Sequence, residues 1–290
     1  MCPSFLFYLT SIQFIRIQLG TLSGTLAPIN VTRYVTQHVD RPVTPVTPSF
    51  ALLVLNQPLR NLKVVKKLWG NASAHFAADG GANCLFEAMS ADGHPAFNDL
   101  QAIIGDLDSL RDDVRTFFVS GPAQTRIVHD SSVYTTDFGK AVGYIRQQHD
   151  CANTQPIDIV VVGGLGGRVD QGLSQLHHLH LFQKDAAYTA GRMYLVSEES
   201  VTFLLKAGRH RIRIREEVAG DEVFAKYVGI LPVREPSVIT TRGLEWDVQD
   251  WETEIGGQVS TSNHVLPETE VVEVETTADV LFTIALRELG

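Results

Sequence analysis

The segment IDIVVVGGLGGRVDQGLSQLHHLHLF, residues 157–182, decides the fold class. Its first part, IDIVVVGG (157–164), is a short apolar run that ends in glycine, as a buried strand does. Its last part, QGLSQLHHLHLF (171–182), predicts a helix. A strand, a glycine loop and a helix in succession indicate one unit of an α/β fold.

The same alternation of strand and helix precedes this segment. Strands are predicted at 50–56, 73–79, 100–106 and 125–130, and helices at 62–69, 82–89, 111–119 and 137–148. In the last of these helices, Phe138, Ala141, Val142 and Ile145 recur at helical spacing. Short continuous apolar strands that alternate with helices predict a parallel sheet covered on both faces.

Beyond about Met193 the predicted elements are almost all strands. HRIRIR and VVEVE alternate with period two, as half-exposed antiparallel strands do. We therefore predict an α/β parallel-sheet domain at 48–208, followed by a small all-β sandwich domain at 209–290. Residues 1–47 are predicted to be a poorly ordered extension, with an organelle-targeting peptide and a wrongly assigned start as alternatives.

Composition restricts the partners and the compartment. The 290 residues include 33 acidic and 24 basic ones, and no Lys/Arg cluster forms a stripe, so nucleic acid is not a predicted partner. Three scattered cysteines (Cys2, Cys84, Cys151) without a C-x-x-C motif fit a reducing cytoplasm and argue against a zinc site. The apolar N-terminus has no basic residue before it and is interrupted by Arg16, so no membrane span is predicted.

Acidic residues follow the strands of the predicted parallel sheet. Because the carboxyl ends of parallel strands meet at one edge, five aspartates converge there: Asp79, Asp106, Asp108, Asp137 and Asp170. A single acid at a strand end is usually a helix N-cap, and Asp137 and Ser109 are good candidates for that role. Five together repel one another unless cations neutralise them, which indicates a Mg²⁺ site for phosphate chemistry.

The glycine loop by itself matches no standard nucleotide motif. Val169 stands where G-x-G-x-x-G has its third glycine, and the Lys-Ser/Thr of a P-loop is absent. The small residues still permit close backbone approach to an anion at a helix N-terminus, and Arg168 could add a bidentate phosphate contact.

Six motifs in order carry a more specific signal. The chain contains ADGGAN (78–83), IIGDLDSL (103–110), TTDFGKA (135–141), GGLGGRVDQ (163–171), GLEWDV (243–248) and VSTSN (259–263). This series resembles the thiamine pyrophosphokinase family, particularly its eukaryotic branch, over about residues 50–287. The resemblance implies an α/β catalytic domain, a β-sandwich that binds thiamine, and a homodimer whose sites lie where domains of two subunits meet. The implied reaction converts ATP and thiamine to AMP and thiamine diphosphate.

The resemblance also implies roles for single residues. Asp106, Asp108 and Asp137 would be the catalytic residues and would hold Mg²⁺ on the triphosphate. The implied nucleotide contacts are Asp79, Gly80, Asn83, Ser109, Lys140 and Arg168. The implied thiamine contacts are Asp170, Gln171, Ser260, Ser262 and Asn263, with Trp246 stacked on the thiamine rings in a cation–π arrangement suited to the thiazolium.

One position departs from the family pattern. The family has Asp-Gln shortly before its Thr-Asp, whereas this chain has Ser132-Val133. Either Asp130 or Tyr134 replaces the glutamine as a thiamine contact, or thiamine binds more weakly. This departure motivates a second hypothesis, a non-catalytic thiamine or nucleotide sensor that keeps the fold. The retained Asp106, Asp108 and Asp137 favour an active enzyme, because a degenerate one is expected to lose its metal ligands first.

Other conspicuous side chains have simpler interpretations. His177, His178 and His180 match no metal-binding spacing and are predicted to lie on a partly exposed helix face. An ion pair between Lys140 and Asp137 is an alternative to a phosphate contact. Trp69 and Trp251 are predicted to be packing residues.

Overall fold

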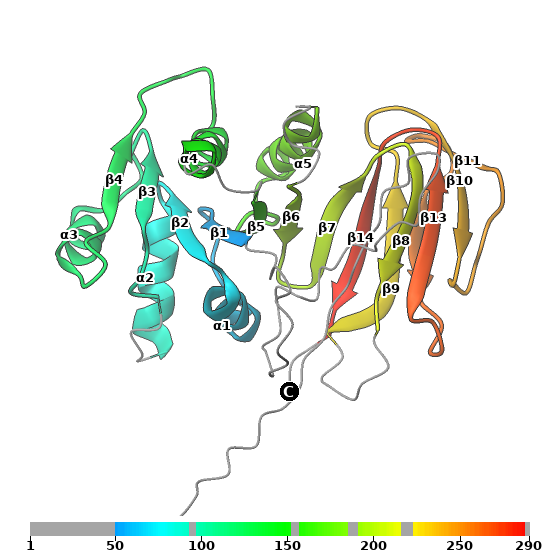
Figure 1. Ribbon diagram of the computed structural model, residues 1–290, viewed down its shortest axis with the longest axis horizontal. Helices are drawn as coiled ribbons and strands as arrows, with labels where there is room; N and C mark the ends of the chain where they lie inside the picture. The colour runs from blue at the N-terminus through cyan, green and yellow to red at the C-terminus, as the bar shows by residue number, and fades with distance from the viewer. Residues whose placement is uncertain (1–49, 93–96, 152–156, 185–190, 216–222, 288–290) are drawn as a thin grey trace, which may run out of the picture.

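The computed structural model describes residues 50–92, 97–151, 157–184, 191–215 and 223–287 (Figure 1). Within these ranges the strands form a ten-stranded sheet and a four-stranded sheet. The extension predicted at 1–47 lies outside the described residues.

Six parallel strands make one half of the larger sheet. They run in the order β6-β5-β1-β2-β3-β4. Their bounds are β1 (Phe50–Val54), β2 (Ala74–Ala78), β3 (Ala102–Gly105), β4 (Arg126–His129), β5 (Asp158–Val162) and β6 (Met193–Val196). Strand β1 pairs on one side with β2, the next strand in the sequence, and on the other side with β5. The strand order therefore reverses between β1 and β5, which is where open α/β sheets form a ligand crevice at their carboxyl edge.

Helices cover both faces of this parallel half, as predicted. Helices α1 (Leu62–Asn71), α2 (Gly81–Asp92) and α3 (Asp112–Ser120) lie on one face, and α4 (Asp137–Cys151) and α5 (Val169–Gln183) lie on the other (Figure 1). Alternate side chains of β1 enter the two layers: Leu52 packs in one buried cluster and Leu53 in the other. All four residues of the helical stripe predicted in α4 are buried: Phe138, Ala141, Val142 and Ile145.

The second half of the larger sheet is antiparallel. It consists of β7 (Ser200–Leu205), β14 (Val280–Leu286), β9 (Phe224–Leu231) and β12 (Ser260–His264), in that order outward from β6. The sheet therefore continues past residue 208, because β7 lies before that residue and β9, β12 and β14 lie after it. The predicted boundary near Gly208 coincides with the first residue of β8 and stays a prediction.

The four-stranded sheet packs against this antiparallel half. Its strands are β11 (Trp251–Thr253), β10 (Ser237–Arg242), β13 (Val271–Thr276) and β8 (Gly208–Arg213). The two strands predicted from HRIRIR and VVEVE pair with each other antiparallel, as β8 and β13. Ile212 and Val272 enter the core, whereas the outward Arg211 forms an ion pair with Glu273 (3.1 Å). The predicted fold class, an α/β parallel sheet followed by β-sandwich strands, is confirmed.

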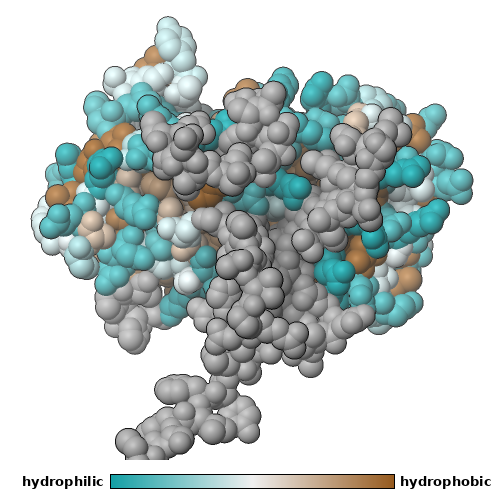
Figure 2. All heavy atoms as spheres, viewed as in Figure 1, coloured by the Kyte–Doolittle hydropathy of each residue, from teal (hydrophilic) through white to brown (hydrophobic). Residues whose placement is uncertain are grey.

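One face of the molecule is mostly hydrophilic over its described residues. Figure 2 shows hydrophilic residues over most of the described part of this face, with hydrophobic residues scattered among them. Among the described helices, none combines the length and the hydropathy that a bilayer span requires.

Candidate active site

Three aspartates converge at the carboxyl edge of β2 and β3. Carboxylate oxygens of Asp79, Asp106 and Asp108 all lie within 4.8 Å of one another, close enough to bind one metal ion. Gly105 makes this approach possible, because a Cβ there would lie 2.9 Å from both the Cβ of Asp79 and Oδ1 of Asp137. Asp79 (φ 41°) and Leu107 (φ 66°) adopt the left-handed region, which is uncommon for residues other than glycine and is often found at functional sites.

Asp79 is the buried member of this cluster, with 3% of its surface exposed. Its Oδ2 accepts a hydrogen bond from the backbone N–H of Ser109 (3.1 Å), whereas its buried Oδ1 has no partner within the described residues. Burial raises the pKa of Asp79 above its ordinary value, and the charges of Asp137 and Asp108 raise it further. The hydrogen bond from Ser109 lowers this pKa but does not outweigh these effects. A buried carboxylate oxygen without a hydrogen-bond donor is a good ligand for a hard cation.

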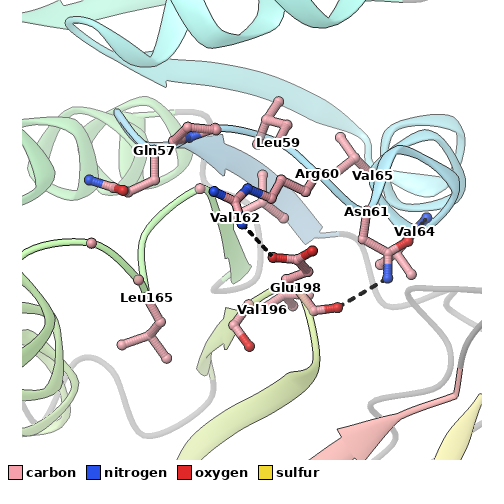
Figure 3. A pocket seen from close by; sticks show the side chains of 15 residues that line it. Gln57, Leu59, Arg60, Asn61, Val64, Val65, Val162, Leu165, Val196 and Glu198 are labelled. Carbon is pink, nitrogen blue, oxygen red and sulfur yellow. Dashed lines mark hydrogen bonds and ion pairs between the residues drawn. The ribbon is translucent and has the colours of Figure 1, made fainter.

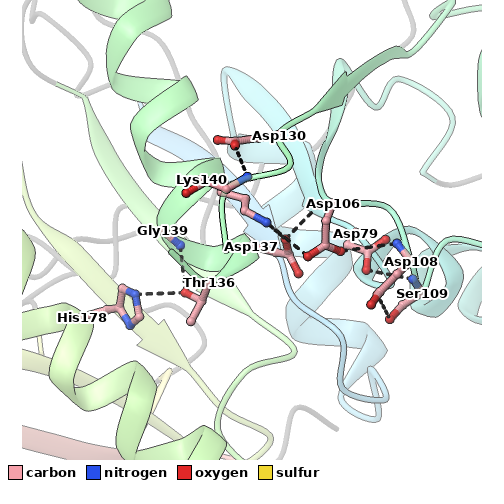
Figure 4. Close-up of polar contacts among 11 residues, drawn as sticks. Asp79, Asp106, Asp108, Ser109, Asp130, Thr136, Asp137, Gly139, Lys140 and His178 are labelled. Carbon is pink, nitrogen blue, oxygen red and sulfur yellow. Dashed lines mark hydrogen bonds and ion pairs between the residues drawn. The ribbon is translucent and has the colours of Figure 1, made fainter. Parts of the chain in front are cut away.

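Lys140 neutralises part of the remaining charge. Its side chain is 2% exposed, and its Nζ donates to Oδ2 of Asp106 (3.2 Å) and to Oδ1 of Asp137 (3.0 Å; Figure 4). Burial alone would lower the pKa of Lys140, but the hydrogen bonds to Asp137 and Asp106 outweigh it, so that this pKa is raised. Desolvation of Asp106 is likewise outweighed by hydrogen bonds from Lys140 and from the backbone of Asp108, which lower the pKa of Asp106. The predicted ion pair between Lys140 and Asp137 is confirmed.

Asn83 and Ser109 support the loop that carries the acids. Asn83 Nδ2 donates to the carbonyl of Ser109 (2.7 Å), and its Oδ1 accepts from the backbone N–H of Arg111 (3.2 Å). The hydroxyl of Ser109 donates to Oδ1 of Asp108 (3.0 Å). At Gly80 a Cβ would lie 2.4 Å from the side-chain amide of Asn56, so a larger residue there would displace the Asn56 side chain. These predicted nucleotide contacts therefore all lie beside the acidic cluster.

The glycine loop after β5 forms a wall of a cavity at the crevice between β1 and β5. The cavity has a volume of about 150 Å³ and also contacts the segment after β1 and the turn after β6 (Figure 3). At Gly163 (φ 68°) a Cβ would lie 2.7 Å from the carbonyl of Leu55, and at Gly167 (φ 64°) it would lie 2.7 Å from Oε1 of Gln57. A cavity of this size holds one small aromatic ring. The loop is thus a tight strand-to-helix connection that also shapes a binding space.

Polar side chains rim this cavity. Arg60 forms an ion pair with Glu198 (3.8 Å), and Asn61 Nδ2 donates to the carbonyl of Glu198 (3.1 Å). Asn61 also caps α1, because its side-chain oxygen accepts from the N–H of Val64 (3.3 Å). None of these residues was predicted from the sequence. Arg60 and Asn61 follow β1 without an acidic or glycine-rich motif, and Glu198 lies in the turn after β6.

Arg168 and Asp170 face each other at the start of α5. Arg168 Nε and Nη2 donate to the two carboxylate oxygens of Asp170, at 3.0 and 2.6 Å, and both side chains are exposed. The hydrogen bond from Arg168 lowers the pKa of Asp170. An exposed ion pair of this kind is readily exchanged for contacts to a ligand. Gln171, also exposed, follows in the same turn.

Trp246 lies in the other half of the molecule, in the loop between β10 and β11. This residue is 55% exposed. The amide of Asn263 holds the loop, accepting from the backbone N–H of Trp246 (3.1 Å) and donating to its carbonyl (2.9 Å). Asp247, which was not predicted as a site residue, accepts from the N–H of Gly243 (2.9 Å) and from the hydroxyl of Thr241 (2.9 Å). The hydrogen bonds of Asn263 therefore fix the backbone of Trp246 in this loop.

The predicted acids and the predicted residues of β12 lie far apart in the ten-stranded sheet. Ser260, Ser262 and Asn263 are on β12, at the outer edge of the antiparallel half. The acids follow β2 and β3, and β3 is eight strands away from β12 in the same sheet. At about 4.8 Å a strand, eight spacings amount to roughly 38 Å, and twist shortens this only in part.

Comparison with known proteins agrees with the motifs. The thiamin pyrophosphokinase catalytic domain matches residues 65–189, and the thiamin pyrophosphokinase vitamin B1 binding domain matches residues 209–281. Thiamine pyrophosphokinase 3 of Oryza sativa subsp. japonica is 34% identical over 249 residues, covering 82% of this chain and 88% of that protein. The chain belongs to the thiamine pyrophosphokinase family.

Further relatives of this family agree in sequence and structure. Thiamine pyrophosphokinase 1 of Arabidopsis thaliana is 34% identical, covering 83% of this chain and 88% of its own length. The structure of thiamin pyrophosphokinase from Candida albicans superposes with a TM-score of 0.72 at 27% identity, covering 83% of this chain and 90% of that one. The predicted family and the prediction of an enzyme with thiamine diphosphokinase activity are confirmed. The alternative of a non-catalytic sensor has no support.

Within this thiamine pyrophosphokinase fold, the predictions for His178 and for the helix caps at Asp137 and Ser109 were wrong. His178 is buried, not part of an exposed face, because its ring packs between Phe138 and Phe182 of α4 and α5 (centroids 4.9 and 5.4 Å). The cap of α4 is Thr136, whose hydroxyl accepts from the N–H of Gly139 (3.2 Å), and Asp137 is the first helical residue. Helix α3 begins at Asp112, so Ser109 does not cap it.

The tryptophan predictions were correct. Trp69 is buried, stacks on His75 (centroids 4.1 Å apart) and donates to Oδ1 of Asp99 (2.5 Å). Trp251 packs against the main buried cluster.

Proposed function

We propose that this chain transfers the pyrophosphoryl group of ATP to thiamine, at a Mg²⁺ site held by aspartates of the parallel half. The observation that carries the proposal is the convergence of Asp79, Asp106 and Asp108 within 4.8 Å. In the reaction, the hydroxyethyl oxygen of thiamine attacks the β-phosphorus of ATP, the bond from that phosphorus to the α–β bridging oxygen breaks, and AMP leaves. A carboxylate of the cluster takes the proton of the hydroxyl group.

The donor set fits Mg²⁺. The site offers only carboxylate oxygens, and one of them, Oδ1 of the buried Asp79, lacks a hydrogen-bond partner among the described residues. Asp106 and Asp108 would hold the ion, Asp137 is the third ligand that the family resemblance implies, and Asp79 is within reach. When bound, the ion neutralises the triphosphate and polarises the phosphorus that is attacked.

The other residues would bind and orient the substrates. Arg168 would exchange its contact with Asp170 for a phosphate, which leaves Asp170 and Gln171 to contact thiamine. Lys140 is a fixed positive charge next to Asp106 and Asp137 and would draw the triphosphate toward the cluster. Trp246 would stack on the thiamine rings.

We further propose that the active enzyme is a homodimer in which each site combines two subunits. The separation of roughly 38 Å between β3 and β12 supports this, because a thiamine molecule is much shorter than that distance. A second copy can bring its Trp246 and the loop at Ser260 and Ser262 to the acids of the first. In this scheme 48–208 is the catalytic domain and 209–290 the thiamine-binding domain. We place the enzyme in the cytoplasm on the basis of its sparse cysteines.

The direct test is an assay of AMP release from Mg-ATP with and without thiamine. Purified protein is expected to form AMP and thiamine diphosphate in equal amounts, and only when thiamine and Mg²⁺ are both present. AMP release that does not depend on thiamine would overturn the proposed acceptor.

Replacing Val133 with glutamine is expected to tighten thiamine binding and leave ATP affinity unchanged. Val133 is 87% exposed on the loop between β4 and α4, at the position where the family has a thiamine-binding glutamine. One restored hydrogen bond contributes about 0.5–1.5 kcal/mol. Thiamine titrations of wild type and Val133→Gln measure the difference, with Val133→Leu as an apolar control. An unchanged affinity means that another group, such as Tyr134, already contacts thiamine.

The affinity of the site for divalent cations is expected to fall on acidification, beginning above the pH at which an ordinary aspartate titrates. Burial raises the pKa of Asp79, so this carboxylate is protonated first as the pH falls, and a protonated carboxyl group binds metal poorly. Mn²⁺ titrations of the free protein between pH 7 and 5 provide the measurement. Asp79→Asn should bind Mn²⁺ more weakly at pH 7 and show a flatter pH dependence. Parallel pH curves for the two proteins would contradict the assignment.

A further inference from the structure

Three hydrogen bonds run from the middle of α5 to the first turn of α4. His178 Nδ1 lies 2.6 Å from the carbonyl oxygen of Ser174, and its Nε2 lies 3.0 Å from Oγ1 of Thr136. The same hydroxyl oxygen lies 3.2 Å from the backbone nitrogen of Gly139. Figure 4 shows the contacts of Thr136 with His178 and Gly139, on the side of the acidic cluster opposite to Asp108.

The chemistry of the end groups sets the direction of each bond. A carbonyl oxygen only accepts, so Nδ1 of His178 carries a hydrogen and donates it to Ser174. Burial lowers the pKa of His178, and this effect outweighs the hydrogen bond to Ser174, which raises the pKa. The ring is therefore neutral, and its Nε2 is an acceptor. The hydroxyl of Thr136 therefore donates to Nε2, and its oxygen lone pair accepts from the N–H of Gly139. The histidine thus fixes the rotamer in which Thr136 caps α4.

The residue next to this cap is Asp137. Its Oδ1 accepts from the backbone N–H of Asp106 (3.1 Å) and from Lys140 (3.0 Å), so its carboxylate lies against the cluster. The rest of α4 is held by other side chains, because Ala141, Val142 and Ile145 are buried in the core. The histidine–threonine contact therefore acts on the position of the first turn, where a small displacement moves Asp137 relative to Asp106.

We propose that His178 and Thr136 are positioning residues that hold the carboxylate of Asp137 in the geometry needed for metal binding. The inference rests on the proposed Mg²⁺ site. It also links the two helices that border the site, since α5 carries Asp170 in its first turn and α4 begins at Asp137.

The test compares matched variants at both ends of the contact. Thr136→Val removes the hydroxyl at nearly constant shape, and Thr136→Ser keeps it. His178→Phe keeps an aromatic ring between Phe138 and Phe182 but removes both nitrogens, and His177→Phe is the control on the exposed neighbour. The readouts are Mn²⁺ affinity of the free protein, kcat and KM for both substrates, and the ¹⁵N spectrum of the histidine rings.

We expect His178→Phe to weaken Mn²⁺ binding about fivefold, which corresponds to the loss of one hydrogen bond. Thr136→Val should weaken it at least as much, because it also removes the acceptor for the N–H of Gly139. Because both variants break the histidine–threonine contact, the double variant should bind Mn²⁺ no more weakly than Thr136→Val alone. Thr136→Ser and His177→Phe should remain close to wild type, with KM for thiamine unchanged throughout. The ¹⁵N spectrum should show His178 protonated at Nδ1, with the Nε2 signal shifted in Thr136→Val.

The outcomes separate this inference from the proposed function. Wild-type Mn²⁺ affinity in Thr136→Val, or additive losses in the double variant, would overturn the positioning role while the metal site stands. A wild-type protein that binds no Mn²⁺ rejects the metal site and this inference together. If thermal unfolding shows that His178→Phe does not fold, the comparison of Thr136→Val with Thr136→Ser and the ¹⁵N spectrum test the positioning role instead.

Discussion

Replacing Asp108 or Asp137 with asparagine is expected to lower kcat by several orders of magnitude while the protein stays folded. Either change removes one negative charge from a carboxylate cluster proposed to hold the ion that neutralises the triphosphate. Asparagine has the shape of aspartate, and an amide oxygen at position 137 can still accept from the N–H of Asp106. Asp108 is exposed, so its replacement leaves the buried clusters intact.

The measurement is steady-state AMP formation over a range of Mg²⁺ concentrations, together with thermal unfolding of each variant. Asp113→Asn is the matched control, because Asp113 is an exposed acid on the neighbouring α3 that contacts Arg111 (3.3 Å). This control should keep wild-type kcat. Near-normal turnover of both Asp108→Asn and Asp137→Asn at saturating Mg²⁺ would reject these two acids as metal ligands.

Periodicity in the sequence predicted the parallel half well. The apolar runs at β1, β2 and β3 are completely buried, and such strands have few alternatives to a covered parallel sheet. The extent of the sheet could not be predicted in the same way. Strand β7 joins the edge of β6, and β14, β9 and β12 then pair onward, because strand pairing depends on contacts far apart in the chain. A boundary drawn from the change in pattern could not show that the sheet continues across it.

The acids of the candidate site were predictable because each follows a strand of one parallel sheet. The detailed contacts were not. Asp79 joins Asp106 and Asp108 because its backbone adopts a left-handed conformation (φ 41°), which the motif alone does not encode. His178 looked like an exposed residue because its partner, Thr136, lies 42 positions away in the sequence. The hydrogen bonds of Asn263 to Trp246 likewise depend on the way two loops fold together.

Mixing two inactive variants is expected to restore activity if each site is shared between subunits. Asp106→Asn should cripple every site of its own dimer by weakening metal binding. Trp246→Ala should do so by removing the stacking area and the cation–π attraction for the thiazolium. The loop should keep its shape in Trp246→Ala, because Asn263 bonds to the backbone of residue 246 and not to the ring.

The distance within one chain makes the prediction specific. Asp106 follows β3 and the loop of Trp246 is fixed to β12, eight strands away, or roughly 38 Å at about 4.8 Å per strand. In a mixed dimer, one site then collects both lesions and the other collects neither. If half of the dimers are mixed, total activity should recover to about a quarter of wild type.

The control is a mixture of Asp106→Asn with Asp137→Asn, two lesions in the same half of the chain. Every site of that mixed dimer still carries one lesion, so no activity should return. Subunit exchange is verified in both mixtures with two different affinity tags. If Asp106→Asn and Trp246→Ala exchange subunits but recover no more activity than this control, then both residues serve one site within a single chain, and the shared site is rejected. Recovery in the first mixture alone assigns the acids to one subunit and the thiamine platform to its partner, since only that arrangement produces an intact site from two damaged chains.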